Sequence, residues 1–434
     1  VTVTVDAAGM ITAVAAGEAA PATVKGIALP AMPNLHSHAH QRLMLGLAER
    51  AGPGADSFWT WREVMYGFAL KLGPDDLRAV AAQLYVEMLK AGFTTVGEFQ
   101  YLHHQPDGRP YDNRAELSLA CLAAAEDAGI GLTLLPTLYN FGGFGGQPAN
   151  PGQRRFLNDA DGFLTIYSNL RKAVAGKPLH RLGIAPHSLR AVTVELLGTV
   201  LNGIDPLAPV HIHIAEQTKE VDDCRAWKGV RPVDYLLEQF SVSSRWCAIH
   251  ATHMTPAETA ALARSGAIAG LCPTTEANLG DGIFPATDFL KAGGAFGIGS
   301  DSHISVSPAE DLRMLEYSQR LRDRTRNALA DGPGLSTGHS LYSRALKGGA
   351  QALAQPVGTL APGYRADLIV LDPDCDALMG RTADAALDTW IFSGGNPCVK
   401  DVFVAGRAVI TDRRHPGQDR IARNFRSTLE RLSA

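Results

Sequence analysis

The most informative stretch of the sequence is the run Val210-His211-Ile212-His213-Ile214-Ala215-Glu216. Apolar residues alternate with two histidines in this run. Because side chains alternate between the two faces of a strand, the pattern predicts a buried β-strand with both imidazoles on one face. An acidic residue, Glu216, follows the strand. We therefore expect polar side chains to gather at its C-terminal end.

Seven other short apolar runs resemble this one, and stretches with helical spacing separate them. The eight runs cover residues 27–35, 94–101, 130–139, 182–187, 210–215, 246–250, 267–272 and 295–299. The predicted helices cover residues 74–91, 114–128, 162–175, 193–201, 232–240 and 256–265, and several open with proline, which is favoured in a first helical turn. Strands that alternate with helices form a parallel sheet, and eight such units predict a (β/α)8 TIM-like barrel of the α/β class.

The two ends of the chain show alternating β patterns, at residues 1–5, 11–15, 366–371 and 401–410. Neither end has enough apolar residues to bury a core alone, so we expect both to pack together as a small β-sandwich. The predicted organisation is a sandwich from residues 1–28 and 357–415, a barrel from residues 29–356, and a helical tail from residues 416–434.

The composition excludes several classes of protein. Of the 434 residues, 46% are hydrophobic and 19% are charged, which is typical of a folded globular protein. The formal net charge of -4 gives no cationic excess for nucleic acid or for an anionic membrane, so we expect neither as a partner. Six scattered cysteines without a CxxC pair, and a start without a charged-then-apolar secretion signal, indicate a cytoplasmic protein.

Histidines and an aspartate stand at the ends of several predicted strands. The first strand ends in Pro33-Asn34-Leu35-His36-Ser37-His38, where the two-residue spacing directs both imidazoles to one side. His250 ends the sixth strand, and Asp301 follows the eighth. Taken alone, each signal is also consistent with a buried structural histidine or a helix cap.

The combination favours a metal site, because all of these residues fall at the same mouth of one predicted barrel. Three neutral imidazoles and one carboxylate suit a borderline divalent ion, which lowers the pKa of a bound water toward neutrality. We assign His213 to the metal, and His211 either to packing in the barrel interior or to a position behind the metal ligands. Zn²⁺ is preferred, although the ligand types do not separate it from Fe²⁺ or Ni²⁺. The predicted metal ligands are His36, His38, His213 and Asp301.

Taken together, these motifs resemble the amidohydrolase superfamily, in its mononuclear deaminase branch. The segment from Gly358 to Asp372 is similar to the C-terminal sandwich signature of that superfamily. His187, not lysine, stands at the end of the fourth strand, so the resemblance implies one metal ion instead of a carboxylated-lysine pair. It also implies a homodimer.

Within this branch, the likeness is strongest to the formiminoglutamate deiminases. Three segments carry it: Asn34 to Arg42, Ser57 to Arg62, and Cys272 to Gly282. This resemblance implies hydrolytic deamination of N-formimino-L-glutamate to N-formyl-L-glutamate and ammonia, a step of histidine degradation. The chain departs from the family at His40, where an aromatic residue is expected, and we predict that this histidine lies in a loop.

The resemblance also implies roles for individual residues. A substrate with two carboxylates needs guanidinium groups, and Arg62, in the long loop after the first strand, and Arg190 are the candidates, although either could instead form a surface salt bridge. The catalytic residues implied are Glu216 as the proton shuttle, His250 as a hydrogen-bond partner of the reacting water, and Asp301. The implied polar companions of the arginines are Gln41, Tyr101 and His187.

Two other interpretations stay open from the sequence. A deaminase of the same branch that acts on a guanine-like or adenosyl-type heterocycle predicts aromatic stacking in place of paired arginines. A metal-free relative predicts loss of the histidine and carboxylate set. His303, two residues after Asp301, could lie behind the metal ligands, but the prediction favours ordinary loop structure.

Overall fold

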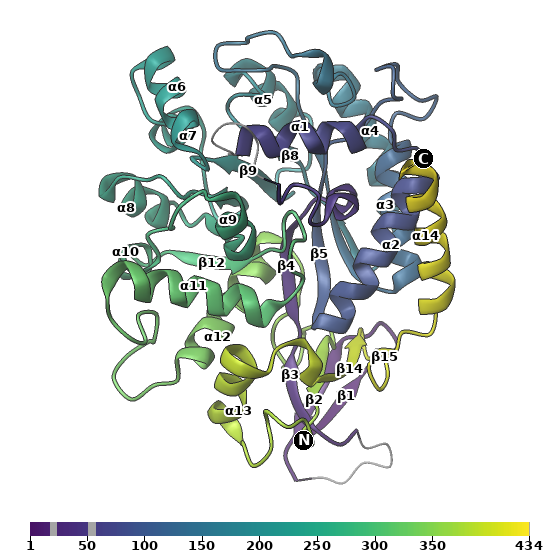
Figure 1. The fold of residues 1–434 in the computed structure, drawn as a ribbon, viewed down its shortest axis with the longest axis vertical. Coiled ribbons are helices and arrows are strands. Elements are labelled where there is room, and N and C mark those ends of the chain that lie inside the picture. The colour runs from purple at the N-terminus through teal and green to yellow at the C-terminus, as the bar shows by residue number, and fades with distance from the viewer. Residues whose placement is uncertain (18–23, 51–57, 434) are drawn as a thin grey trace.

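The computed structural model describes residues 1–17, 24–50 and 58–433. Its centre is a ring of parallel strands that carries the predicted runs (Figure 1), except that residues 27–30 of the first run form a strand of the terminal sheet instead. The strands of this ring are β4 (Met32–Ser37), β5 (Phe93–Gln100), β6 (Gly131–Leu138), β7 (His180–Leu182), β8 (Ala185–Pro186), β9 (Val210–Ile214), β10 (Trp246–His250), β11 (Ile268–Leu271) and β12 (Ala295–Ile298).

The ring closes through ladders and single bridges. Strands β4 to β7 pair in order, β8 pairs with β6, and β9 to β12 form a second parallel ladder. Parallel bridges join Ile184 to Val210 and Ser188 to His213, and they connect the two ladders. At the other seam, Ser37 at the end of β4 bridges Asp301 after β12. The (β/α)8 barrel predicted from the alternation is therefore confirmed.

Helices surround the strands in the expected alternation. They are α1 (Phe58–Ala69), α2 (Pro74–Ala91), α3 (Glu116–Ala128), α4 (Ala160–Val174), α5 (Val194–Asn202), α6 (Thr218–Lys228), α7 (Pro232–Gln239), α8 (Pro256–Ser265), α9 (Pro273–Leu279), α10 (Ala286–Lys291), α11 (Pro308–Asp323) and α12 (Thr337–Ala352). Short turns of helix lie at η1 (Ala39–Met44) and η2 (Pro151–Gln153).

Local chemistry explains why these helices begin and end where they do. In α8, the Thr255 hydroxyl accepts a hydrogen bond from the Glu258 backbone amide at 3.2 Å, and the Glu258 carboxylate accepts one from the Thr255 amide at 2.8 Å. This reciprocal pair satisfies two amides that the first helical turn leaves open, and Pro256 fits the same turn. Gly266 ends the helix with a φ of +80°, which glycine adopts at little cost.

The barrel interior is filled by side chains and is no channel. Leu35 reaches into the centre, where a Cβ placed on Gly297 would come within 2.5 Å of its side chain. Glycine is therefore required there for packing. The C-terminal end of α12 plugs the opposite mouth of the barrel, because the Ala352 carbonyl lies 2.8 Å from Nε2 of His211. His211 is thus an interior residue, as predicted.

The chain ends form two small sheets beside that opposite mouth (Figure 1). Strands β1 (Thr2–Val5) and β2 (Ile11–Ala15) pair with each other, and β3 (Ile27–Pro30), β13 (Leu368–Leu371), β14 (Val399–Val404) and β15 (Arg407–Ile410) form an antiparallel sheet. Both chain ends therefore contribute to the accessory part, as predicted.

The remaining helical elements follow the barrel in the chain. They are α13 (Ala383–Thr389), η3 (Trp390–Gly394), η4 (Asn396–Cys398) and α14 (Gln418–Ser433). Helix α14 lies beside α2 (Figure 1). The exact division into three domains stays a prediction. Among the described residues, none of the helices combines the length and the apolar character that crossing a bilayer needs.

Candidate active site and metal centre

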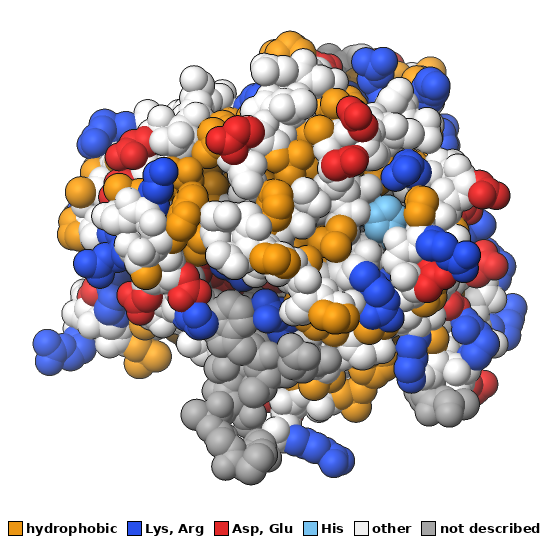
Figure 2. Space-filling model, turned by 90° about the horizontal axis from the view of Figure 1, so that it is seen from above, with side chains coloured by type: hydrophobic (Ala, Val, Ile, Leu, Met, Phe, Trp, Pro, Cys, Tyr) orange, Lys and Arg blue, Asp and Glu red, His pale blue; other side chains and the backbone are white. Residues whose placement is uncertain are grey.

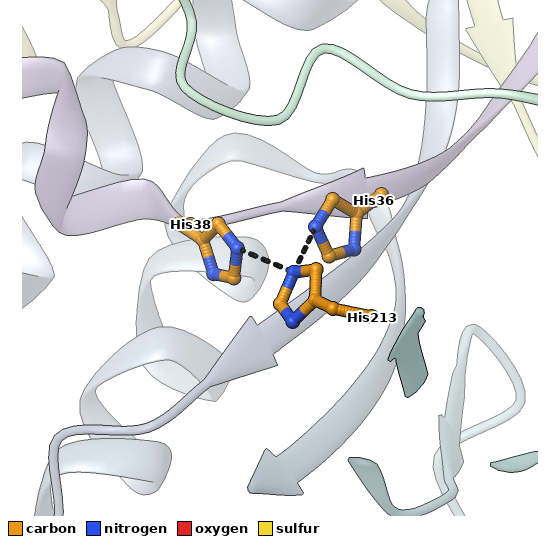
Figure 3. Close-up of side chains that lie close together, drawn as sticks. All are labelled: His36, His38 and His213. Carbon is orange, nitrogen blue, oxygen red and sulfur yellow. Dashed lines mark hydrogen bonds between the residues drawn. The ribbon is translucent and has the colours of Figure 1, made fainter. Parts of the chain in front are cut away.

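Three histidines from two strands meet at the C-terminal mouth of the barrel. His36 and His38 come from the end of β4, and His213 comes from β9 (Figure 3). All three are almost completely buried, with His213 the most exposed at 6%. The sequence spacing of two is what brings the first pair together, since alternate residues of a strand share one face.

The donor atoms of this cluster are spaced as a metal centre requires. Nε2 of His213 lies 3.1 Å from Nε2 of His36 and 3.4 Å from Nε2 of His38. Oδ1 of Asp301 lies 3.4 Å from Nε2 of His36 and 3.5 Å from Nε2 of His38. Ligands bound tetrahedrally to Zn²⁺ at about 2.0–2.1 Å lie about 3.3–3.4 Å from one another. The observed separations fit this arrangement.

The hydrogen bonds of His38 and His213 also support a metal centre. Nδ1 of His38 faces the Phe99 carbonyl at 2.9 Å, and Nδ1 of His213 faces the His187 carbonyl at 2.9 Å. A carbonyl can only accept, so each Nδ1 carries the hydrogen, and each neutral ring keeps its lone pair on Nε2. Two lone pairs thus face each other across 3.4 Å, an arrangement that a cation between them stabilises.

The electrostatics keep these rings neutral. Burial lowers the pKa of His36 and of His213 well below the usual value, and the neighbouring histidines lower it further. Burial also lowers the pKa of His38, although Asp301 and the Phe99 carbonyl oppose the shift. Neutral imidazole is the form that binds a metal ion, so the cluster suits this role at neutral pH.

The loops that carry the polar groups have unusual backbone angles. Asp301 has a φ of +46° and His250 a φ of +67°, both in the left-handed region that residues other than glycine seldom adopt. The Asp301 amide donates to the His36 carbonyl at 3.0 Å, and the His38 amide donates to the Asp301 carbonyl at 3.2 Å. These bonds compensate for the strained backbone and hold Asp301 against β4.

Next to the cluster, three carboxylates surround His250. Nε2 of His250 lies 3.7 Å from Oδ2 of Asp301 and 3.9 Å from Oε1 of Glu216. Its Nδ1 lies 3.2 Å from Oε1 of Glu276. Burial lowers the pKa of His250, but the three carboxylates raise it more, to about 10. A histidine in this setting carries a positive charge near neutral pH.

Glu216 is also buried, with 4% of its surface exposed. Burial is the largest effect on the pKa of this carboxyl and raises it, His250 and Arg190 oppose the shift, and Asp301 adds to it. The net pKa lies above the usual glutamate value. A carboxyl whose pKa is shifted toward neutrality can both accept and release a proton during a reaction.

A single pocket joins these groups to the predicted substrate-binding residues. The atom-free space within it is about 580 Å³, part of it open to solvent. The predicted residues on its wall are His38, Gln41, Arg62, Tyr101, His187, Arg190, His213, Glu216, His250 and Asp301. The structure therefore brings together all of the predicted site residues; His36 does not line the pocket, but its Nε2 lies 3.1 Å from Nε2 of His213.

Two of the pocket's polar residues are fixed by a shared partner. The Tyr101 hydroxyl accepts a hydrogen bond from Nε2 of Gln41 at 3.0 Å and lies 2.9 Å from Nε2 of His40. His40, predicted to be a loop residue, instead lies buried in η1. His40 is the position where the chain departs from the family pattern. Because His40 contacts Tyr101, which lines the pocket, this departure affects the pocket wall.

One other prediction is corrected. Arg62 lies on helix α1, not in a loop, and its guanidinium stands over the Tyr66 ring at 5.5 Å. His303 lies in a loop, as predicted, and this loop residue is fully buried, with its ring 3.3 Å from the hydroxyl of Ser37 and 3.0 Å from that of Ser300. Ser57 of the quoted Ser57 to Arg62 motif lies outside the described residues.

The sequence did not identify several residues of the site. Glu276, the partner of His250, lies within the quoted Cys272 to Gly282 segment, and its position four residues after Cys272 on a short helix was the available signal. The apolar and aromatic wall of the pocket was also missed, since its members carry no motif. These wall residues are Trp61, Met65, Tyr66, Tyr139, Phe156 and Leu279.

Together, the barrel, the His-Asp cluster and the adjoining Glu216 define a hydrolase with a candidate metal site at the mouth of a (β/α)8 barrel. Comparison with known proteins makes this specific. The model of the amidohydrolase family matches residues 27–409. The chain belongs to this family, and the resemblance inferred from its motifs is confirmed.

Individual relatives agree with this assignment. The chain is 58% identical over 407 residues to the formimidoylglutamate deiminase of Pseudomonas aeruginosa. The aligned region covers 94% of this chain and 90% of that protein. It is 27% identical to a 5-methylthioadenosine/S-adenosylhomocysteine deaminase of Natronomonas pharaonis, over 89% of this chain and 82% of that protein.

Solved structures share the fold. The crystal structure of an amidohydrolase from Brucella melitensis superposes with a TM-score of 0.93 at 51% identity, over 99% of this chain and 95% of the other. An adenosine deaminase from Xanthomonas campestris with bound zinc gives a TM-score of 0.81 at 23% identity, over 98% of this chain and 92% of the other. At this lower identity the likeness concerns the fold alone.

Proposed function

We propose that the protein hydrolyses the formimino group of N-formimino-L-glutamate and releases N-formyl-L-glutamate and ammonia. The observation that carries this proposal is the presence of two guanidinium groups, Arg62 and Arg190, on the wall of the pocket that also holds Glu216. A substrate with two carboxylates suits such a pair, because guanidinium groups bind carboxylates through forked hydrogen bonds. The 58% identical relative named a formimidoylglutamate deiminase supports the same substrate.

The metal centre fits one divalent ion, with Zn²⁺ preferred. His36, His38, His213 and Asp301 would hold it, since their donor atoms converge at 3.1–3.5 Å. When bound, such an ion lowers the pKa of a water molecule and polarises the reacting group of the substrate.

The chain's own residues account for binding and proton movement. The two arginines anchor the substrate carboxylates, and Gln41, Tyr101 and His187 offer hydrogen bonds along the pocket wall. Burial lowers the pKa of Arg190, but Glu220, Tyr139 and Glu216 raise it more, so its guanidinium stays charged. The substrate is thereby held with its formimino carbon toward the carboxylates at the barrel mouth.

Three groups then divide the chemistry. Asp301 takes a proton from the attacking water as the water adds to the formimino carbon. Glu216, ionised in the free enzyme, accepts the second proton of this water and passes both protons to the departing nitrogen, so that the tetrahedral adduct collapses to the formyl product and neutral ammonia. The positively charged His250, 3.7 Å from Asp301 and 3.9 Å from Glu216, stabilises negative charge that develops on the attacking oxygen.

We further propose, from the family resemblance, that the protein works as a homodimer in the cytoplasm. The described Lys and Arg side chains in Figure 2 are interspersed with Asp and Glu side chains instead of forming one basic area. This surface suits a small-molecule enzyme better than a nucleic-acid-binding protein. Analytical ultracentrifugation of the purified protein tests the oligomeric state, and a monomer at micromolar concentration would contradict it.

The test of the function is ammonia release from a panel of substrates. N-formimino-L-glutamate, guanine and adenosine-type compounds are compared at equal concentration, with metal-replete protein. Turnover of N-formimino-L-glutamate at least a hundredfold above the heterocycles supports the proposal. Turnover of a heterocycle with an inert formimino compound would reject the substrate and favour the heterocycle-deaminase alternative.

A further inference from the structure

His250 is held by a side chain that the proposed reaction does not use. Glu276 lies in the short helix α9, directly after β11, and only 5% of it is exposed. Its Oε1 accepts a hydrogen bond from the Cys272 backbone amide at 2.9 Å and lies 3.2 Å from Nδ1 of His250. The carboxylate is therefore anchored to the backbone of its own helix on one side and meets the imidazole on the other.

We propose that Glu276 is a positioning residue that fixes the ring of His250 for catalysis. This inference rests on the proposed function, in which Nε2 of His250 faces Asp301 and Glu216. A carboxylate beside Nδ1 requires a hydrogen on that nitrogen, and it disfavours the flipped ring, which would turn a C–H edge toward Glu276. Glu276 thus determines that Nε2, and no carbon atom, is directed at the reacting groups.

The backbone of His250 makes such support necessary. His250 and Ala251 have φ angles of +67° and +48°, so the chain leaves β10 in a strained conformation. Strain of this kind persists only where surrounding contacts determine the geometry. The bond to Glu276 ties the imidazole to the next barrel unit, beyond the strand that carries it.

Helix α9 is in turn tied to the loop of Asp301. The Thr275 hydroxyl accepts a hydrogen bond from the Ser302 amide at 3.2 Å and lies 3.3 Å from the Ser300 carbonyl, to which it donates. Neighbouring residues of one helical turn therefore contact both the His250 ring and the loop that carries Asp301. Through this turn, the relative position of His250 and Asp301 is set by a rigid element instead of by two separate loops.

The test compares two substitutions at this position. Glu276→Gln keeps an oxygen that can accept from Cys272 and from His250, whereas Glu276→Ala removes it. We expect Glu276→Ala to lower kcat roughly a hundredfold, the cost of a misplaced reacting group, with KM changed less than about fivefold. Glu276→Gln should retain kcat within about tenfold of the wild type. Metal content should stay at the wild-type level in both variants, because Glu276 does not touch the four converging donor atoms.

A matched control separates positioning from general packing. Asp311 is another buried carboxyl bound to the same helix, through the Thr274 hydroxyl at 2.8 Å, and it lies on α11. Asp311→Asn should leave kcat within about threefold. A loss in Asp311→Asn as large as that in Glu276→Ala would overturn the proposal, because the effect would then belong to the helix as a whole.

A double variant provides the decisive measurement. If Glu276 acts through His250, Glu276→Ala should lower kcat by less than about threefold in a His250→Asn background. Full additivity of the two losses, or wild-type kcat in Glu276→Ala, would reject the inference. Wild-type turnover is measured alongside: an inert wild type rejects the proposed substrate, whereas an active wild type with additive variants rejects only the role of Glu276.

Discussion

Replacing Glu216 by glutamine is the sharpest test of the proposed chemistry. The backbone amides of Ala215 and Glu216 both donate to the Glu220 carboxylate at 3.2 Å, so the loop after β9 is held independently of the Glu216 side chain. Glutamine has nearly the same shape as glutamate but cannot carry the proton. The substitution therefore removes one chemical function and leaves the local structure in place.

The magnitude follows from the environment of this carboxyl. General acid-base catalysis contributes 10²–10⁴-fold and is most effective when the pKa is near the working pH. Because the pKa of Glu216 is raised from its usual value toward that range, we expect kcat to fall by about 10³-fold, or about 4 kcal/mol of transition-state stabilisation. KM should change by less than about fivefold, since the arginines that would bind the carboxylates are untouched.

The pH dependence gives a second signature. Glu216 must be ionised in the free enzyme to accept a proton, so kcat/KM should fall as the pH drops through its pKa. A raised pKa places this acid limb above about 4.3, the ordinary value for glutamate. Ammonia release is measured across pH with wild type and Glu216→Gln at equal metal content. Turnover of the variant within tenfold of the wild type, or an unchanged acid limb, would refute the reasoning.

Four further outcomes are expected. Arg190→Met should raise KM for N-formimino-L-glutamate about 30- to 100-fold, the cost of a lost charge-assisted contact, with a smaller change in kcat; an unchanged KM would contradict its role. Arg365→Met removes a buried guanidinium bonded to Asp367 at 2.8 Å and to Gln355 at 2.9 Å, and should cost about 3–5 kcal/mol, seen in calorimetry as a Tm lowered by about 4 °C. Burial lowers the pKa of His103 to about 3, so the unfolded state takes up the proton first as the pH falls below about 6.5. The free energy of unfolding should therefore drop by about 2 kcal/mol by pH 5. In urea titrations, His103→Gln should abolish this part of the drop. A chelator that strips divalent ions should abolish ammonia release, and added Zn²⁺ should restore it; full activity with less than 0.05 ion per chain would exclude a metal-dependent reaction.

Regular local signals explain why much of the fold could be predicted. The helices over 74–91 and 256–265 begin at proline and end before a left-handed glycine, and the structure has them at the predicted bounds. The apolar run over 27–35 was less informative, since it contains two strands, β3 in the terminal sheet and β4 in the barrel. Hydrophobicity alone does not show where a buried chain leaves one sheet for another.

The candidate site, like the fold, could be predicted only in part. Residues that extend a strand pattern, such as His36, His38 and His213, could be assigned to one mouth because strand periodicity fixes their direction. Glu276 could not, because its contact with His250 depends on how a helix after one strand turns toward the strand beside it. Tyr66 and Tyr139 could not be predicted as pocket residues either, since an aromatic residue in a pocket wall has the same local sequence pattern as one in the core.

The bridge between Ser37 and Asp301 has a consequence for biosynthesis. The first and last strands of the ring meet there, so the four donor groups are spread over more than 260 residues of chain, from His36 to Asp301. Until the eighth strand of a growing polypeptide has emerged from the ribosome, the only predicted metal ligands available are the three histidines. If the proposed ion binds, all four of its ligands are present only after about 70% of the chain has been made, and the bound ion would then link the first and last strands of the ring.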